Sequence, residues 1–142
     1  MQKIASKNDV ESSISWLGMV DGNFKWELFY AADVFCLPSH QENFGIAIVE
    51  AMACGLPVLI SYKVNIFETI VTSGAGIANE DSIEGVIRGI NEWINLDPYK
   101  KKMMKKFAIN CYESHFTISK GVNSLFEHFE PTLWISLLAV FI

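Results

Sequence analysis

Residues 34–61 read VFCLPSHQENFGIAIVEAMACGLPVLIS, and this stretch decides the fold. Two short apolar runs, Val34–Pro38 and Pro57–Ser61, flank a polar turn and a longer apolar stretch, Phe44–Cys54. Short apolar runs bounded by turn residues are typical of strands that are buried on both faces. The longer stretch has the length of a crossover helix, and the glycine and proline that follow it are helix stop signals. We therefore predict a β-α-β unit with parallel strands.

The same alternation continues on both sides of this unit. Further apolar runs at Ile14–Val20 and Gly76–Ala78 predict two more strands. Helical patterns cover Asn23–Ala32, Asn65–Thr72, Ser82–Asn95 and Asp97–Glu130, the last with a break near Phe116 and Thr117. The fold class predicted from this order is α/β, a Rossmann-like parallel sheet flanked by helices.

Composition limits the kind of protein. The chain has 142 residues, of which 51% are hydrophobic and 19% charged, and a net charge of −5. This is enough for one domain with a real core, and it excludes a disordered tail. The acidic balance, with Arg88 as the single arginine, argues against nucleic acid as a partner. Cys36, Cys54 and Cys111 have no metal-site spacing and are read as reduced, buried thiols.

The two ends of the chain differ in character. Residues 1–10 lack the apolar run of a signal peptide, which favours a cytoplasmic protein. Residues 1–130 are read as one partial domain, and residues 131–142 as an apolar tail without a charge. Such a tail is shorter than the roughly 20 residues that span a bilayer. A docking helix, an interfacial segment and a truncated span remain open for it.

Glu50 is the residue whose position indicates a ligand. It is the only charge between Phe44 and Val58, in a helix that has to pack on the sheet. A buried carboxylate without a partner is strongly unfavourable, so the sequence predicts a group that donates hydrogen bonds to Glu50. The alternative is a local lysine or arginine, although no basic residue lies between Lys25 and Lys63, or a position at the helix edge where the carboxylate reaches water.

The start of the same helix suits an anion. Gly45 lies in the expected first turn, where free amides and the positive end of the helix dipole favour close approach of a negative group. Asn43, Ile46 and Glu50 would share one stripe, which places Glu50 about one turn, ~5.4 Å, behind those amides. A nucleotide would then place its diphosphate on the helix end and its ribose on Glu50. Glu42, before the helix, suits either a sugar hydroxyl or the helix dipole.

These residues resemble a known family. Glu42 and Glu50 form an E-x(7)-E motif within PSxxExFGxxxxEAMAxGxPV, which closely resembles the donor-binding domain of the group 1 glycosyltransferases, retaining enzymes of the GT-B fold. The resemblance covers roughly residues 12–130 and includes further segments in family order. These segments are WLGMV at 16–20, LFYAADV at 28–34, PVLIS at 57–61, SGAGIA at 73–78 and ESHF at 113–116.

The resemblance implies an activity and a set of site residues. The activity is sugar transfer from a nucleoside diphosphate sugar to an acceptor hydroxyl with retention of configuration, without a metal or another cofactor. Glu42 would be the catalytic residue that contacts the transferred sugar, and Glu50 would bind the ribose hydroxyls. The remaining donor-binding candidates are Asn43, Phe44, Gly45, Ile46 and His40, the last of which is otherwise a solvated loop residue.

The resemblance also implies what this chain lacks. The family's acceptor-binding half, and the first two β-α units of the donor domain with a diphosphate-binding arginine and lysine, would precede Trp16. With the family's strand order, Ile14–Val20 would have lost its neighbours, so we predict a partial sheet with a gap or with Ile14–Val20 paired beside Val34–Pro38. Catalysis would then need the missing acceptor half, either as a separate acceptor-domain subunit or as the rest of a longer enzyme of which this chain is a fragment. A non-enzymatic nucleotide-sugar-binding module and an inactive fragment are the alternatives.

Two further features stay open. Glu68 follows the strand at Pro57–Ser61, at a place where family members carry a glutamate near the site. The run KKKMMKK at 100–106 holds five of the eleven basic residues. It is either a solvated helix face or a peripheral contact with an anionic membrane at its inner, cytoplasmic face.

Overall fold

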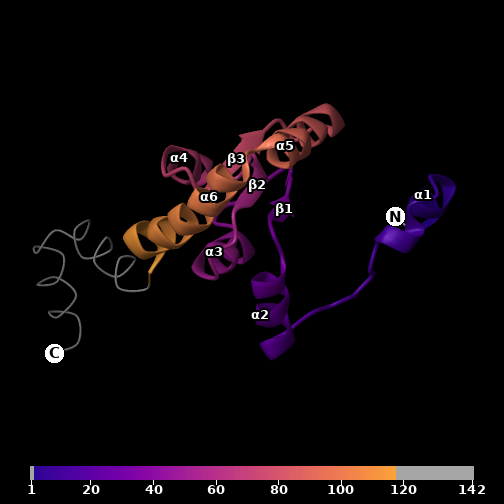
Figure 1. The fold of residues 1–142 in the computed structure, drawn as a ribbon, viewed down its shortest axis with the longest axis horizontal. Helices are drawn as coiled ribbons and strands as arrows, with labels where there is room; N and C mark the ends of the chain where they lie inside the picture. Colours follow the sequence, from indigo (N-terminus) through magenta and orange to yellow (C-terminus); the bar gives the residue numbers. More distant parts are fainter. Residues whose placement is uncertain (1, 118–142) are drawn as a thin grey trace, which may run out of the picture.

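The computed structural model describes residues 2–117 as an α/β fold (Figure 1). Its strands are β1 (Phe35–Leu37), β2 (Val58–Ser61) and β3 (Gly76–Asn79). Its helices are α1 (Gln2–Lys7), α2 (Gly22–Ala31), α3 (Ile46–Ala53), α4 (Phe67–Thr72), α5 (Ile83–Asn95) and α6 (Pro98–Cys111), with short helical turns η1 (Glu11–Ser13) and η2 (Tyr112–Phe116). The β-α-β unit and the alternation that follows it are confirmed.

The described strands form one parallel sheet in the order β1-β2-β3. Phe35 pairs with Val58, and Val58 pairs with Gly76, so the three strands begin at the same level. Their carboxyl ends therefore lie together, and the loops that follow β1, β2 and β3 share one edge of the sheet. This is the edge at which open α/β sheets bind ligands.

One face of the sheet is covered by α3 and α4, and the second half of α6 packs against these two helices. Ile48 and Met52 of α3, Ile70 of α4 and Ala108 of α6 are all buried there, together with Val58. The cluster is almost entirely aliphatic, which explains why α3 is apolar on nearly every side. We call this side the packed face.

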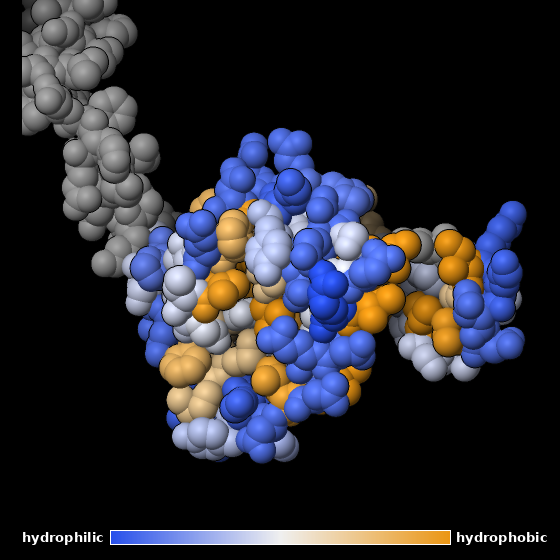
Figure 2. Space-filling model, turned by 90° about the horizontal axis from the view of Figure 1, so that it is seen from above, coloured by the Kyte–Doolittle hydropathy of each residue, from blue (hydrophilic) through white to orange (hydrophobic). Residues whose placement is uncertain are grey.

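The opposite face of the sheet is covered by α5. Leu59, Ile77 and Trp93 form a smaller buried cluster there, which we call the thin face. On the flank of α5, four isoleucines at helical spacing stay exposed, with exposed fractions of 75%, 52%, 38% and 61% for Ile83, Ile87, Ile90 and Ile94. Seen from above, hydrophobic residues gather between hydrophilic ones on the body that carries the sheet, and the N-terminal segment stands apart from that body (Figure 2).

The prediction of a strand at Ile14–Val20 is wrong. These residues are extended or bent but pair with no strand among residues 2–117, and Trp16, Leu17 and Met19 are 44%, 50% and 95% exposed. An apolar run becomes a strand only where a neighbour accepts its hydrogen bonds, and none is present beside it in the described part. The predicted partial sheet is confirmed, but pairing of this segment beside β1 is not observed.

One smaller expectation needs correction, and another is confirmed. Cys36, Cys54 and Cys111 are free thiols, but only Cys111 is buried; Cys54 is half-buried and Cys36 is exposed, because it lies on the edge strand β1. The helical region after Pro98 breaks as expected, because Thr117 leaves the helix for an extended conformation. Residues 118–130 and the apolar tail, 131–142, lie outside the described residues.

Among residues 2–117, no helix combines the length and the apolar character that crossing a membrane requires.

Candidate functional site

The turn between β1 and α3 is shaped by Gly45. Its φ of 67° lies in the left-handed region, and it immediately precedes the helix as N-cap. A Cβ at this position would lie 2.7 Å from Cδ1 of Ile48 and 3.3 Å from Cγ of Glu42. Glycine is therefore required by the backbone and by crowding against the protein itself. The close approach of a ligand at Gly45 stays a prediction beside this internal reason.

Glu42 is anchored at the carboxyl edge of the sheet through its backbone. Its N–H donates to the carbonyl of Lys63 at 3.1 Å, and its carbonyl accepts from the N–H of Asn65 at 3.0 Å. Its carboxylate oxygen Oε1 accepts from the Gly45 N–H at 3.2 Å. A carboxylate at a helix N-terminus is electrostatically favourable, so the position of Glu42 suits the helix dipole, and its contact with a sugar hydroxyl stays a prediction. The first-turn amides of Ile46 and Ala47 have no intrahelical acceptor and can serve a ligand.

Glu50 is paired with a lysine from another helix. Lys25 of α2 donates from Nζ to Oε1 of Glu50 at 2.7 Å, and the two side chains are 30% and 25% exposed. The Lys25 ammonium also lies 4.5 Å from the ring centroid of Trp26. Glu50 therefore has a basic partner within the chain, but this lysine comes from another helix and is not the local partner that the alternative named. A carboxylate offers about four acceptor sites, so this pair leaves acceptor capacity for a ligand.

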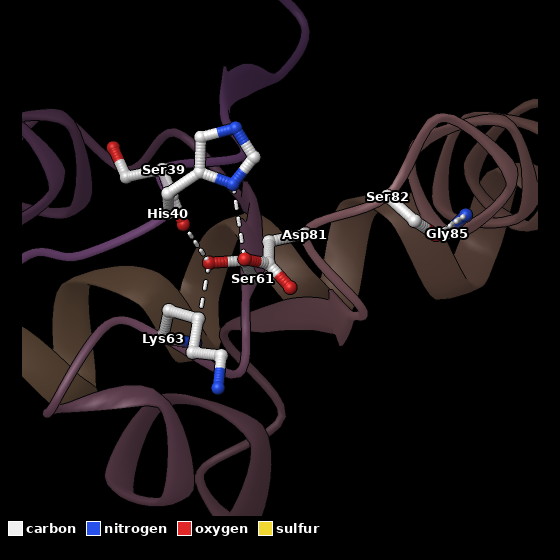
Figure 3. A network of polar contacts seen from close by, with 7 residues as sticks. All are labelled: Ser39, His40, Ser61, Lys63, Asp81, Ser82 and Gly85. Atoms are coloured by element: carbon white, nitrogen blue, oxygen red, sulfur yellow. Dashed lines mark hydrogen bonds and ion pairs between the residues drawn. The ribbon is translucent and has the colours of Figure 1, made fainter.

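His40 and Asp81 join two loops at the same edge of the sheet (Figure 3). Nδ1 of His40, after β1, lies 3.0 Å from Oδ2 of Asp81, after β3. This hydrogen bond from His40 is the main cause that lowers the pKa of the Asp81 carboxyl below its ordinary value. Beneath them, the buried Ser61 hydroxyl donates to the Ser39 carbonyl and accepts from the Lys63 N–H. His40 itself is 86% exposed, as a solvated loop residue would be.

The other donor-binding candidates present a mixed surface in front of α3. Phe44 and Ile46 are 48% and 69% exposed. The Phe44 ring packs edge-on against Phe116, with centroids 6.0 Å apart, which ties this turn to η2. Asn43 is exposed in the loop before Gly45, so the predicted stripe of three residues is wrong at its first member. The helix starts later than predicted because Gly45 adopts a left-handed conformation.

Glu68 lies in the first turn of α4 and is exposed. Within residues 2–117 there is no group of three or more His, Cys, Asp or Glu side chains arranged to hold a metal ion. The structure thus gathers Glu42, Gly45, Ile46 and Glu50 around the start of α3, and it places Glu68 in a separate helix.

Sequence reasoning missed two partners in this site. Lys25 precedes Glu50 by 25 residues, and Asp81 follows His40 by 41 residues. Only the topology could have revealed them, because helices and loops at neighbouring strands come together in a parallel sheet.

The fold defines a Rossmann-like α/β domain, with Glu42, Gly45 and Glu50 gathered at the carboxyl edge of its parallel sheet. The family model described as glycosyl transferases group 1 matches residues 1–114. The chain therefore belongs to the group 1 glycosyltransferase family.

Several proteins with curated names that are similar to this chain are named as glycosyltransferases. An uncharacterized glycosyltransferase of Methanocaldococcus jannaschii is 39% identical over 89 residues, which are 59% of this chain and 23% of that protein. The O-antigen chain mannosyltransferase B of Escherichia coli is 28% identical over 70% of this chain and 26% of its own length. A D-inositol 3-phosphate glycosyltransferase of Segniliparus rotundus is 30% identical over 62% of this chain and 19% of its own length. The chain thus spans about a fifth to a quarter of these relatives.

Two solved structures share the fold. Sucrose-phosphate synthase from Thermosynechococcus elongatus superposes with a TM-score of 0.79 at 21% identity, over 98% of this chain and 34% of that one. WaaG, a glycosyltransferase involved in lipopolysaccharide biosynthesis, superposes with a TM-score of 0.72 at 23% identity, over 87% of this chain and 33% of that one. Both confirm the Rossmann-like domain of a GT-B fold.

Proposed function

We propose that this chain is the donor-binding part of a retaining glycosyltransferase, which transfers a sugar from a nucleoside diphosphate sugar to an acceptor hydroxyl. The observation that carries the proposal is the position of Glu50, a partly buried carboxylate in the helix whose first-turn amides face the carboxyl edge of the sheet. Membership of the family supports the reaction class.

The donor would lie across the start of α3. Its diphosphate would meet the amides of Ile46 and Ala47, and its ribose hydroxyls would donate to Glu50. Phe44 and Asn43 would flank the sugar, and Glu42 and His40 would contact its hydroxyls. Negative charge grows on the diphosphate as it leaves, so the helix amides would stabilise the transition state more than the ground state. We propose that this chemistry proceeds without a metal or another cofactor.

The Lys25 ammonium bears on how Glu50 would bind the ribose. It holds one oxygen of Glu50, which fixes the position of the carboxylate while the other oxygen is left for the ribose. A donor would therefore bind beside the ion pair and would not have to break it.

The partner of this site would be an acceptor-binding domain. The chain covers about a third of the two solved structures, whose remaining two thirds have no counterpart in it. We propose that transfer takes place in the cytoplasm and requires a separate subunit or chain segment that carries the acceptor domain.

Calorimetric titration with uridine and guanosine diphosphates, and with their sugars, tests the donor site. We expect one nucleotide to bind, and Glu50→Gln to weaken that binding by about tenfold or more, because hydrogen bonds to a charged acceptor are lost. Glu84→Gln, which removes the same charge from the exposed first turn of α5, is the matched control and should change nothing. If the wild-type chain binds neither nucleotide, the donor site does not exist.

A transfer assay separates the remaining alternatives. Nucleotide binding without transfer, even with an added acceptor domain, would favour a non-enzymatic nucleotide-sugar-binding module. Transfer by the chain alone would contradict the need for an acceptor domain.

A further inference from the structure

An apolar groove lies far along the sheet from the donor site, beside the amino end of the edge strand β3. It has a volume of about 320 Å³ and runs between the end of α5 and the first half of α6. Its apolar lining consists of Ile77, Leu96, Tyr99, Met103, Met104 and Phe107. Unbranched methionines and aromatic rings form an adaptable surface that suits flexible apolar chains.

The lysines of α6 divide into two groups. Lys101 donates to the carbonyl of Ile94 at 3.0 Å and lies 5.1 Å from the ring centroid of Trp93, and Lys105 pairs with Asp33 at 3.4 Å. These two hold α6 in place. Lys100, Lys102 and Lys106 are exposed and form no ion pair with any of residues 2–117.

The free lysines border the groove. Helical spacing puts Tyr99, Met103 and Phe107 on one ridge of α6, with Lys102 and Lys106 on one side and Lys100 on the other. Tyr99 is 70% exposed and Phe107 37% exposed, so the ridge projects from the surface. The single acidic residue in the groove lining is Glu92 of α5. Positive charge is therefore concentrated here, in a chain whose net charge is −5.

We propose that this groove and its three free lysines form a docking surface for an anionic phospholipid membrane. The lysine ammonium groups would contact lipid phosphates, while the ridge would enter the boundary between headgroups and acyl chains. Long lysine side chains suit this role because their stems cover apolar surface while their charged ends reach the headgroups. A second copy of the chain fits less well, because it would bring its own free lysines against these.

The surface is independent of the donor site. It lies at the opposite end of β3 from Asp81, and it shares no residue with the turn before α3. Membrane binding can therefore be measured whether or not a nucleotide binds.

Vesicle co-sedimentation of the full chain tests the proposal. We expect binding to phosphatidylcholine vesicles that contain about 30% phosphatidylglycerol, and little binding to pure phosphatidylcholine. The double variant Lys102→Glu/Lys106→Glu should bind the anionic vesicles about tenfold less, and Tyr99→Ser should weaken binding at constant charge. Lys3→Glu/Lys7→Glu in α1 makes the same change in net charge and should bind like the wild type.

Each contrary result overturns the proposal. It fails if the wild type binds neither kind of vesicle, or binds both equally, or if the α6 double variant binds as well as the wild type. Equal weakening by both double variants would show that overall charge, and not this surface, attracts the membrane. Any contribution of residues 131–142 is common to the two double variants. Circular dichroism melting curves confirm that the variants are folded.

Discussion

The two faces of the sheet bury hydrophobic clusters of different size. Three helices bury a large aliphatic cluster on the packed face, where Ile48 and Met52 are fully buried. The thin face has three buried members, and the isoleucines of α5 next to it remain exposed. Parallel sheets are stable when both faces are covered, so the packed face carries most of the stability of this chain. One measurement tests this inequality directly, and two others test side-chain pairs that lie outside both buried clusters.

The largest effect should separate the two hydrophobic clusters. We expect Ile48→Ala to lower the free energy of unfolding by about 3 to 4 kcal/mol, because the dense surroundings of Ile48 cannot collapse into the cavity. Leu59→Ala on the thin face should cost about 2 kcal/mol, since that cluster is small and can relax. Urea denaturation with a constant m-value measures both. An equal cost at the two positions would contradict the inequality.

A smaller effect concerns the ion pair between α2 and α3. Lys25→Met keeps most of the side-chain volume but leaves the Glu50 carboxylate without its partner. Since both side chains are only partly exposed, we expect a loss of about 1 kcal/mol in the free energy of unfolding. The double variant Lys25→Met/Glu50→Gln should recover part of this loss, because no unpaired charge remains. Additive losses in this cycle would show that the two groups do not interact.

The smallest effect on the free energy of unfolding is expected for the hydrogen bond between His40, in the loop after β1, and Asp81, in the loop before α5. His40→Ala removes the hydrogen bond that lowers the Asp81 pKa, so this pKa should rise toward its ordinary value. A lowered pKa stabilises the folded state above the ordinary pKa of the group, and this contribution is lost as the pH falls through the folded value. The variant should therefore differ from wild type near neutral pH and converge with it in acid. NMR titration of the Asp81 carboxyl measures the shift, and His40→Gln is the control that keeps a polar group.

The elements that sequence alone predicted are those with complete local signals. Between Val34 and Ser61, strand, turn, helix and strand each carry their own apolar period and stop residues, and the structure has them with small boundary shifts. The segment at Ile14–Val20 carries the same strand pattern but not its neighbour, which no local signal reports. The strand needed a partner from elsewhere, and the pattern could not say whether one was there.

The candidate site shows the same limit at the level of side chains. The spacing of Glu42, Gly45 and Glu50 indicated the helix start and the need for a donor to Glu50, and both are present. The identity of that donor was not predictable, because Lys25 approaches across the fold. The left-handed conformation of Gly45 also shifted the helix start by two residues and removed Asn43 from the stripe.

The edge strand β1 has a practical consequence for anyone who handles the isolated protein. One side of Phe35–Leu37 pairs with β2, and the other side is the rim of the described sheet. Exposed rims of this kind recruit strands from other molecules and seed precipitation. Here the edge strand is only three residues long. It is followed directly by Pro38, which has no N–H to donate to another strand. That proline acts as a gatekeeper, so its replacement by a β-branched residue should be the first change to avoid in any solubility engineering.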